Sequence, residues 1–97
     1  MDAIDTVKHE LRPRLERLIG YLNDTDEVAA ASFFTNILVG LVQLTREEQL
    51  LELFFELSTT AFQGFGFDEV SWALADDVLM YAEQVAQTFT ADQDSAH

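Results

Sequence analysis

The sequence predicts an all-α protein, a four-helix antiparallel bundle. Apolar residues make up 48% of the 97 positions, and they recur at helical spacings of three and four. No stretch alternates apolar and polar residues as a strand does, and Pro13 is the single proline. One domain is expected over residues 1–89, with residues 90–97 as a short polar, flexible tail. The expected helices lie near 3–22, 26–43, 46–63 and 69–89.

The first expected helix carries a narrow apolar seam of the coiled-coil kind. Pro13 projects on the side opposite the seam, so it should bend this helix without breaking it. The segment "NDTDE" that follows offers Asp24 or Thr25 as the N-cap of the next helix. The seam consists of Ile4, Val7, Leu11, Leu15, Leu18 and Leu22.

The second expected helix contains "VAAASFFTNILVGLVQL", residues 28–44, seventeen positions without a charge. As a helix it would rise about 25 Å, less than the roughly 30 Å of a bilayer core, and acidic residues flank it, so we do not expect a membrane span. A helix so apolar around its circumference is normally central in a bundle. The alternative is that its small, uncharged strip lets a second copy or a partner helix approach closely. That strip is Ala29, Ser32, Asn36, Gly40 and Gln43.

Thr45 and Glu48 are spaced as a capping box, which predicts a tight antiparallel connection into the third helix. In "QGFGFDE", Gly64 suits the position after a helix end and Asp68 suits an N-cap, with Phe67 and Trp72 as a hydrophobic staple. The alternative is a binding loop built on the two phenylalanines. The side chains expected to face the core are Leu50, Leu51, Leu53, Phe54, Leu57, Ala61 and Phe62 on the third helix, and Val70, Leu74, Val78, Tyr81, Val85 and Phe89 on the fourth.

The charge is strongly unbalanced. The net charge of −13 falls entirely on residues 21–97, where fourteen acids accompany a single base, Arg46. Direct binding to DNA or RNA is excluded by this balance, whereas a basic protein would be attracted. The alternative is that the acidity serves solubility or a high-salt cytoplasm. The N-terminus lacks an apolar signal segment, so a cytoplasmic location is expected.

Two rows of acids are the candidate functional surface. Glu48, Glu52 and Glu56 lie at i, i+4 and i+8, without an interleaved base. The second row has heptad spacing and borders apolar residues that lie outside the predicted core face. Together they form a candidate docking patch, in which apolar anchors supply affinity and charge selects a basic partner. The alternative is a solvated face. The second row is Glu69, Asp76 and Glu83, and its apolar neighbours are Trp72, Leu79 and Met80.

The sequence offers little for catalysis or for a cofactor. It has no cysteine, and its two histidines, His9 and His97, lie near opposite ends. It contains no Glu-x-x-His pair, no calcium-binding loop and no phosphate-binding loop. We therefore expect no metal site, no cofactor and no enzymatic activity.

These observations predict a non-catalytic protein-interaction module, an adaptor, chaperone or inhibitor that docks a basic partner. One alternative is a DNA mimic, because carboxylates at i and i+4 repeat about every 6 Å along a helix. Another is an accessory subunit of an obligate complex, or a homodimer joined through the seam of the first helix or the strip of the second.

Overall fold

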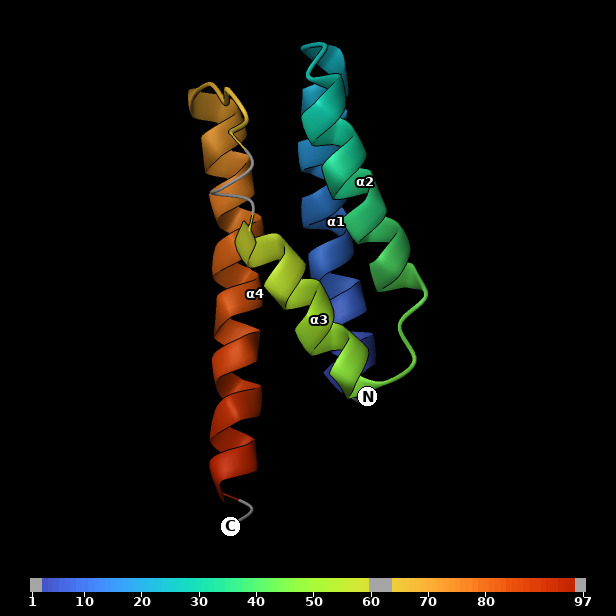
Figure 1. Ribbon diagram of the computed structural model, residues 1–97, viewed down its shortest axis with the longest axis vertical. Coiled ribbons are helices and arrows are strands. Elements are labelled where there is room, and N and C mark those ends of the chain that lie inside the picture. Colours follow the sequence, from blue (N-terminus) through green and yellow to red (C-terminus); the bar gives the residue numbers. More distant parts are fainter. Residues whose placement is uncertain (1–2, 60–63, 96–97) are drawn as a thin grey trace.

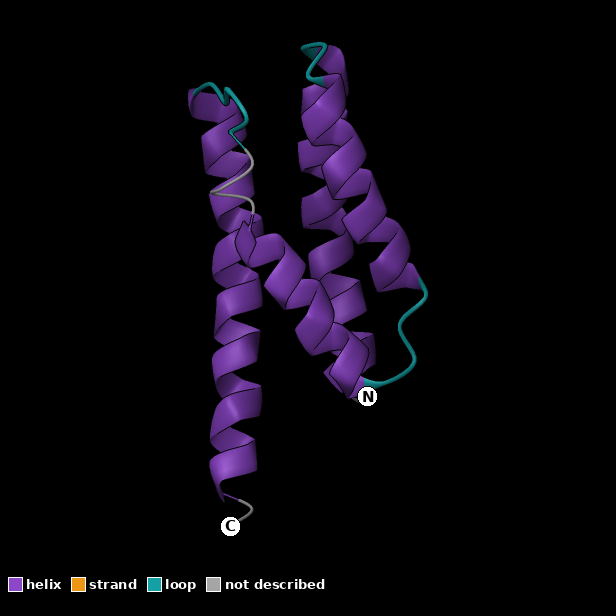
Figure 2. Ribbon diagram, viewed as in Figure 1, coloured by secondary structure: helices purple, strands orange, loops and turns teal. Residues whose placement is uncertain are grey.

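The computed structural model describes residues 3–59 and 64–95, and this part of the chain forms four helices and no strand (Figures 1 and 2). The predicted all-α class is therefore confirmed. Helix α4 continues six residues past its predicted end at residue 89, and the predicted flexibility of residues 90–97 stays a prediction. Residues 60–63, the predicted end of the third helix, lie outside the described residues. The helices are α1 (Ala3–Asp24), α2 (Val28–Val42), α3 (Glu47–Ser58) and α4 (Glu69–Ser95).

The bundle is elongated, with extents of 47 × 22 × 16 Å. Helices α1 and α2 form an antiparallel pair, α4 runs antiparallel to α1, and α3 crosses obliquely from that pair to α4 (Figure 1). Helix α1 contacts each of the other three helices and is the centre of the bundle. Among the described helices, none combines the length and the apolar character needed to cross a bilayer.

The core is built on the predicted seam of α1. Leu11, Leu15, Leu18 and Leu22 have no exposed surface, because the other helices cover them. The seam therefore packs inside the single chain. Pro13 lies within the continuous helix, exposed on the opposite side, as predicted.

The turn between α1 and α2 differs from the prediction. Asp26 has a φ of +61°, and the N–H of Glu27 donates to the carbonyl of Leu22 at 2.8 Å. This is the geometry of a Schellman motif that closes α1. The hydroxyl of Thr25 also donates to the carbonyl of Leu22, at 3.3 Å. The prediction that Asp24 or Thr25 caps α2 was wrong, because these residues belong to the end of α1 and Glu27 is the N-cap of α2.

The predicted capping box of Thr45 and Glu48 was also wrong. Helix α3 begins at Glu47 with Arg46 as its N-cap, so Gln49 takes the third helical position. The side-chain oxygen of Gln49 accepts from the backbone N–H groups of Thr45 and Arg46, at 3.0 and 3.1 Å. A shift of one residue in the helix start moved the capping role from Glu48 to Gln49.

The predicted start of α4 is confirmed. Asp68 is its N-cap, and its carboxylate accepts from the N–H of Ser71 at 2.8 Å. Phe67 and Trp72 form the staple, with ring centroids 5.3 Å apart. Gly64 has a φ of +72°, in the left-handed region that favours glycine.

The aromatic residues before α4 pack on α2. The rings of Phe33 and Phe65 lie 5.8 Å apart, and those of Phe34 and Phe67 lie 6.4 Å apart. Phe65 and Phe67 are both half-buried, so much of their surface is already used in the fold.

Polar contacts join α1 to α4 at two places. The guanidinium of Arg14 lies 3.5 Å from the Asp77 carboxylate and 4.8 Å from the centre of the Tyr81 ring. Closer to the start of α4, the hydroxyl of Tyr21 donates to the Asp68 carboxylate at 2.7 Å. These three contacts, at two places along α1, fix the lengthwise position of α4 against α1.

The apolar circumference of α2 had predicted a central position in the bundle. This prediction was wrong, because α2 lies at the periphery. It buries one face, while Val28, Val39 and Val42 stay exposed, as do most residues of its small polar strip. The reason is that α1 occupies the central position, so α2 needs only one face against it.

The buried face of α4 is rotated from the predicted one. Val70 is 49% exposed, whereas Ser71, Ala75 and Ala82 are buried together with the predicted Val78. Leu74, Tyr81 and Val85 are half-buried at the edge of this face. Small side chains let α4 come close to the core. The predicted core positions Ala61, Phe62 and Phe89 lie outside the described side chains.

Candidate functional site

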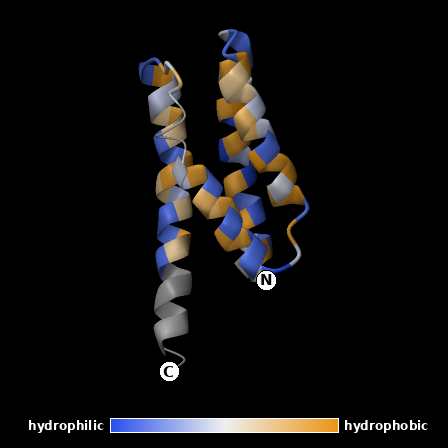
Figure 3. Cartoon of the chain, viewed as in Figure 1, coloured by the Kyte–Doolittle hydropathy of each residue, from blue (hydrophilic) through white to orange (hydrophobic). Residues whose placement is uncertain are grey.

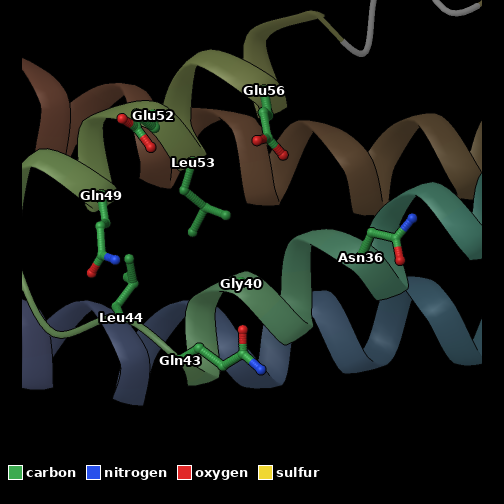
Figure 4. Close-up of a pocket in the computed structure, with 8 residues that line it drawn as sticks. All are labelled: Asn36, Gly40, Gln43, Leu44, Gln49, Glu52, Leu53 and Glu56. Carbon is green, nitrogen blue, oxygen red and sulfur yellow. The ribbon is translucent and has the colours of Figure 1, made fainter.

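Helix α3 separates two grooves, one toward α2 and one toward α4. Figure 3 shows hydrophilic and hydrophobic residues interspersed along α3. The groove toward α2 is lined mostly by polar residues, and the groove toward α4 mostly by apolar residues. The polar groove has a volume of about 240 Å³ and is lined by Asn36, Gly40, Gln43, Leu44, Gln49, Glu52, Leu53 and Glu56 (Figure 4). The apolar groove has a volume of about 510 Å³ and is lined by Leu51, Phe54, Phe55, Leu57, Ser58, Leu79, Ala82, Glu83 and Ala86.

The polar groove depends on a glycine. A Cβ atom placed on Gly40 would lie 3.3 Å from Cδ1 of Leu53, which is closer than ordinary van der Waals contact. Glycine at this position therefore lets α3 approach α2 closely. One member of the small strip identified in the sequence thus has a packing role within the chain.

The polar groove brings together two features that are separate in the sequence. Glu52 and Glu56 extend from α3, and Asn36 and Gln43 extend from the small strip of α2 (Figure 4). The carboxylates accept hydrogen bonds only, while each amide offers both an acceptor and a donor. Among the described residues, no cationic side chain lines the groove. Its chemistry suits an incoming ammonium or guanidinium group.

The apolar groove contains the most exposed large hydrophobic side chain among the described residues. Phe55 is 71% exposed and Leu51 is 39% exposed, although Leu51 had been predicted to face the core. Both lie on the border of the buried face of α3, on the side toward α4. Sequence reasoning missed Phe55, although one signal was available: Phe54 and Phe55 are adjacent, and neighbouring helical positions cannot both point directly at one core.

The first acid row is a continuous exposed surface. Glu48, Glu52 and Glu56 all lie exposed along α3. Glu52 and Glu56 line the polar groove, and they also border a shallow depression on the outer face that contains Leu51 and Phe55. The row therefore runs beside an apolar surface on α3 itself. The sequence had assigned apolar neighbours only to the second row, on α4.

The second acid row meets the grooves at one residue. Glu69, Asp76 and Glu83 are all exposed along α4. Only Glu83 lines the apolar groove, opposite the side chains of α3. Leu51 and Phe55 therefore have acids from both rows nearby: Glu52 and Glu56 on α3, and Glu83 on α4.

The three apolar residues predicted to border that row are dispersed. Trp72 is 44% exposed, and its ring contacts Phe67 near the start of α4. Leu79 is half-buried and lines the apolar groove. Met80 is 60% exposed and lines neither groove. Of the three, Leu79 alone joins the surface formed by α3.

Within the described ranges, no three His, Cys, Asp or Glu side chains gather as a metal site would require. Arg46 and Glu48 form an exposed ion pair at 3.9 Å, next to the start of the acid row. The chemistry that the grooves offer is recognition, with carboxylates and amides on one side of α3 and apolar surface on the other.

Comparisons with protein-family models, with curated proteins and with solved structures found no match for this chain.

Proposed function

We propose that this chain is a non-catalytic protein-interaction module, of the adaptor, chaperone or inhibitor type, which docks a basic partner on the exposed surface of α3. The observation that supports this most directly is the exposure of Phe55 and Leu51 beside Glu52 and Glu56. Apolar side chains at the centre of an interface supply affinity, and charges around them select the partner and speed its approach.

The electrostatics of the surface support a basic partner. Three carboxylates in a row on α3 repel one another, and each such pair costs a few tenths of a kcal/mol in an isolated helix. Across residues 21–97, fourteen acids accompany a single base, Arg46, which pairs with Glu48 at 3.9 Å, so the region has no further base to balance Glu52 or Glu56. A basic partner would relieve this repulsion when it binds.

A second candidate function is a subunit of an obligate complex or homodimer. The observation that favours it is the exposure of Val28, Val39 and Val42 along the outer side of α2. Light scattering of the purified protein tests it, because a single monomeric species at all concentrations would contradict self-association.

Charge reversal on α3 tests the main proposal. We expect the double substitution Glu52→Lys and Glu56→Lys to slow association with a basic partner by about tenfold at low salt, because the attraction that steers the encounter is lost. The remaining association should also depend less on salt. The measurement is the association rate, by surface plasmon resonance, with the partners retained from native lysate.

The matched control compares two single substitutions, Glu56→Lys and Asp24→Lys. Each raises the net charge by two, but Asp24 lies exposed at the end of α1, away from both grooves. If both variants slow association equally, net charge alone drives binding and the α3 surface has no special role. If neither the double variant nor the single variants lose their partners, the proposal fails.

A further inference from the structure

The apolar groove lies in the angle between α3 and α4 (Figure 1), and lining residues recur at the same spacing on both helices. On α3 it is lined by Leu51, Phe55 and Ser58, and on α4 by Leu79 and Ala86 with Glu83 between them. Each set spans positions i, i+4 and i+7, which is roughly 10 Å of helix length. We propose that this groove receives one amphipathic helix of the partner, with apolar side chains in the groove and basic side chains along its flanks. This inference rests on the proposed function and specifies its partner.

The lining of the groove favours a helix over a small molecule. Small-molecule sites place a few polar groups so that they converge on the ligand. Of the described residues that line this groove, only Ser58 and Glu83 are polar, and the others are apolar. Two helices with side chains at i, i+4 and i+7 instead present the holes into which the side chains of a third helix fit.

The charges on both sides of the groove favour basic flanks. Glu52 and Glu56 adjoin Leu51 and Phe55 on α3, and Glu83 lies on the α4 wall. Within the described part of the chain, no basic residue lines the groove or the adjoining depression. A helix with lysine or arginine on both edges of its apolar face would pair with both sets of carboxylates.

The same charges argue against a second copy of this chain as the occupant. Helices α3 and α4 would bring glutamates to glutamates, and α2 carries no charged residue at all. The exposed bases of α1 are balanced within that helix, as in the pair of Arg12 with Glu16. No helix of this chain offers a strongly basic flank.

The test uses two labelled synthetic peptides of about 18 residues, or five helical turns. The first places leucines at i, i+3, i+4 and i+7 with lysines on both flanks. The second has the same composition in an order that destroys the apolar face. We expect the amphipathic peptide to bind at least about tenfold more tightly by fluorescence anisotropy, because only its apolar face fills the groove.

A pair of exposed substitutions locates the binding. Phe55→Ala should lower the affinity for the amphipathic peptide by about tenfold. Met80→Ala should change its affinity less than about twofold, because Met80 is also exposed but lies outside the groove. Circular dichroism of both variants should match the parent protein, since neither side chain is buried.

Other results would separate this inference from the proposed function. If both peptides bind equally well and Glu52→Lys with Glu56→Lys weakens both, the acidic surface binds basic partners but the helix-in-groove inference is overturned. If neither peptide responds to that charge reversal, the proposed function itself fails. Binding of a fluorescent fatty acid that Phe55→Ala abolishes, or a dimer that Phe55→Ala dissociates, would replace the partner helix with another occupant.

Discussion

Helices α1 and α2 are held together in a different way from α1 and α4. The first pair meets through large apolar side chains, with Leu11 and Leu18 of α1 and Phe34 of α2 fully buried. Helix α4 contributes mostly small residues to the core, such as Ala75 and Ala82. This small domain therefore has one tightly interlocked side and one side that depends on close approach and polar contacts.

The difference has a physical consequence for the functional surface. Burial stabilises in proportion to the apolar area removed from water, at about 25 cal/mol per Å², so alanines contribute little each. The larger side chains at the boundary of α3 and α4, Phe55 and Leu79, are left exposed or half-buried. The side of the bundle that buries mostly small side chains is therefore also the side that has apolar surface to offer a partner.

The largest effect should come from breaking the interlocked side. We expect Leu18→Ala to lower the free energy of unfolding by about 3 kcal/mol, because a fully buried leucine leaves a cavity. Phe55→Ala removes a larger side chain, yet it should cost less than about 0.5 kcal/mol, because Phe55 is 71% exposed. Urea unfolding of both variants measures the two changes in the free energy of unfolding. Equal decreases would mean that the two sides of the bundle do not differ as described.

A smaller effect should come from the polar contact between α1 and α4. We expect Arg14→Ala to cost about 1 kcal/mol, since it removes the partly exposed ion pair with Asp77 and the cation–π contact with Tyr81. Arg12→Ala is the control, because its pair with Glu16 is exposed and lies within one helix. It should cost less than about 0.5 kcal/mol.

Arg14→Ala also has a spectroscopic signature. Burial raises the pKa of Tyr81, the nearby Glu10 carboxylate raises it further, and the Arg14 guanidinium lowers it. Because the substitution removes the group that lowers the pKa of Tyr81, it should raise this pKa further. Absorbance titration of the tyrosines measures the change. A Tyr81 titration that does not change would contradict the contact between Arg14 and this ring.

The smallest effect should appear on acidification, at the start of α4. The backbone N–H of Ser71, followed by the Tyr21 hydroxyl, holds the pKa of Asp68 below its usual value, against the opposing effect of burial. A lowered pKa means that the folded state favours the carboxylate. The contribution of the Asp68 carboxylate to the free energy of unfolding is therefore present above its unfolded pKa of about 3.9. It is lost as the pH falls through the lower pKa of the folded state.

Comparison of the parent protein with Asp68→Asn isolates this effect. Repulsion among the other carboxylates also weakens on acidification, so the difference in melting temperature between the two proteins is the quantity to measure. The advantage of the parent should shrink between pH 5 and pH 3. Tyr21→Phe, which removes one donor, should show an intermediate pH dependence, and parallel melting profiles of all three proteins would contradict the cap and its bond to Tyr21.

The candidate surface shows the limit of reasoning from the sequence. The acid row of α3 is exposed as its spacing predicted, because an uninterrupted i, i+4 row of charges has no place in a core. Phe55 was missed, and Trp72 and Met80 were grouped with Leu79 although the fold disperses them. Wheel positions place residues on one helix, but they do not say which neighbouring helix they meet.

The sequence by itself determined the helical class, the leucine seam of α1 and the cap and staple that begin α4, because these features depend on residues within a few positions of one another. Tertiary structure alone decided the rotation of α4, the peripheral position of α2 and the two grooves beside α3. The rotation of a helix follows from how its side chains fit those of its neighbours, and close approach at Ala75 or Gly40 is visible only when both partners are in place.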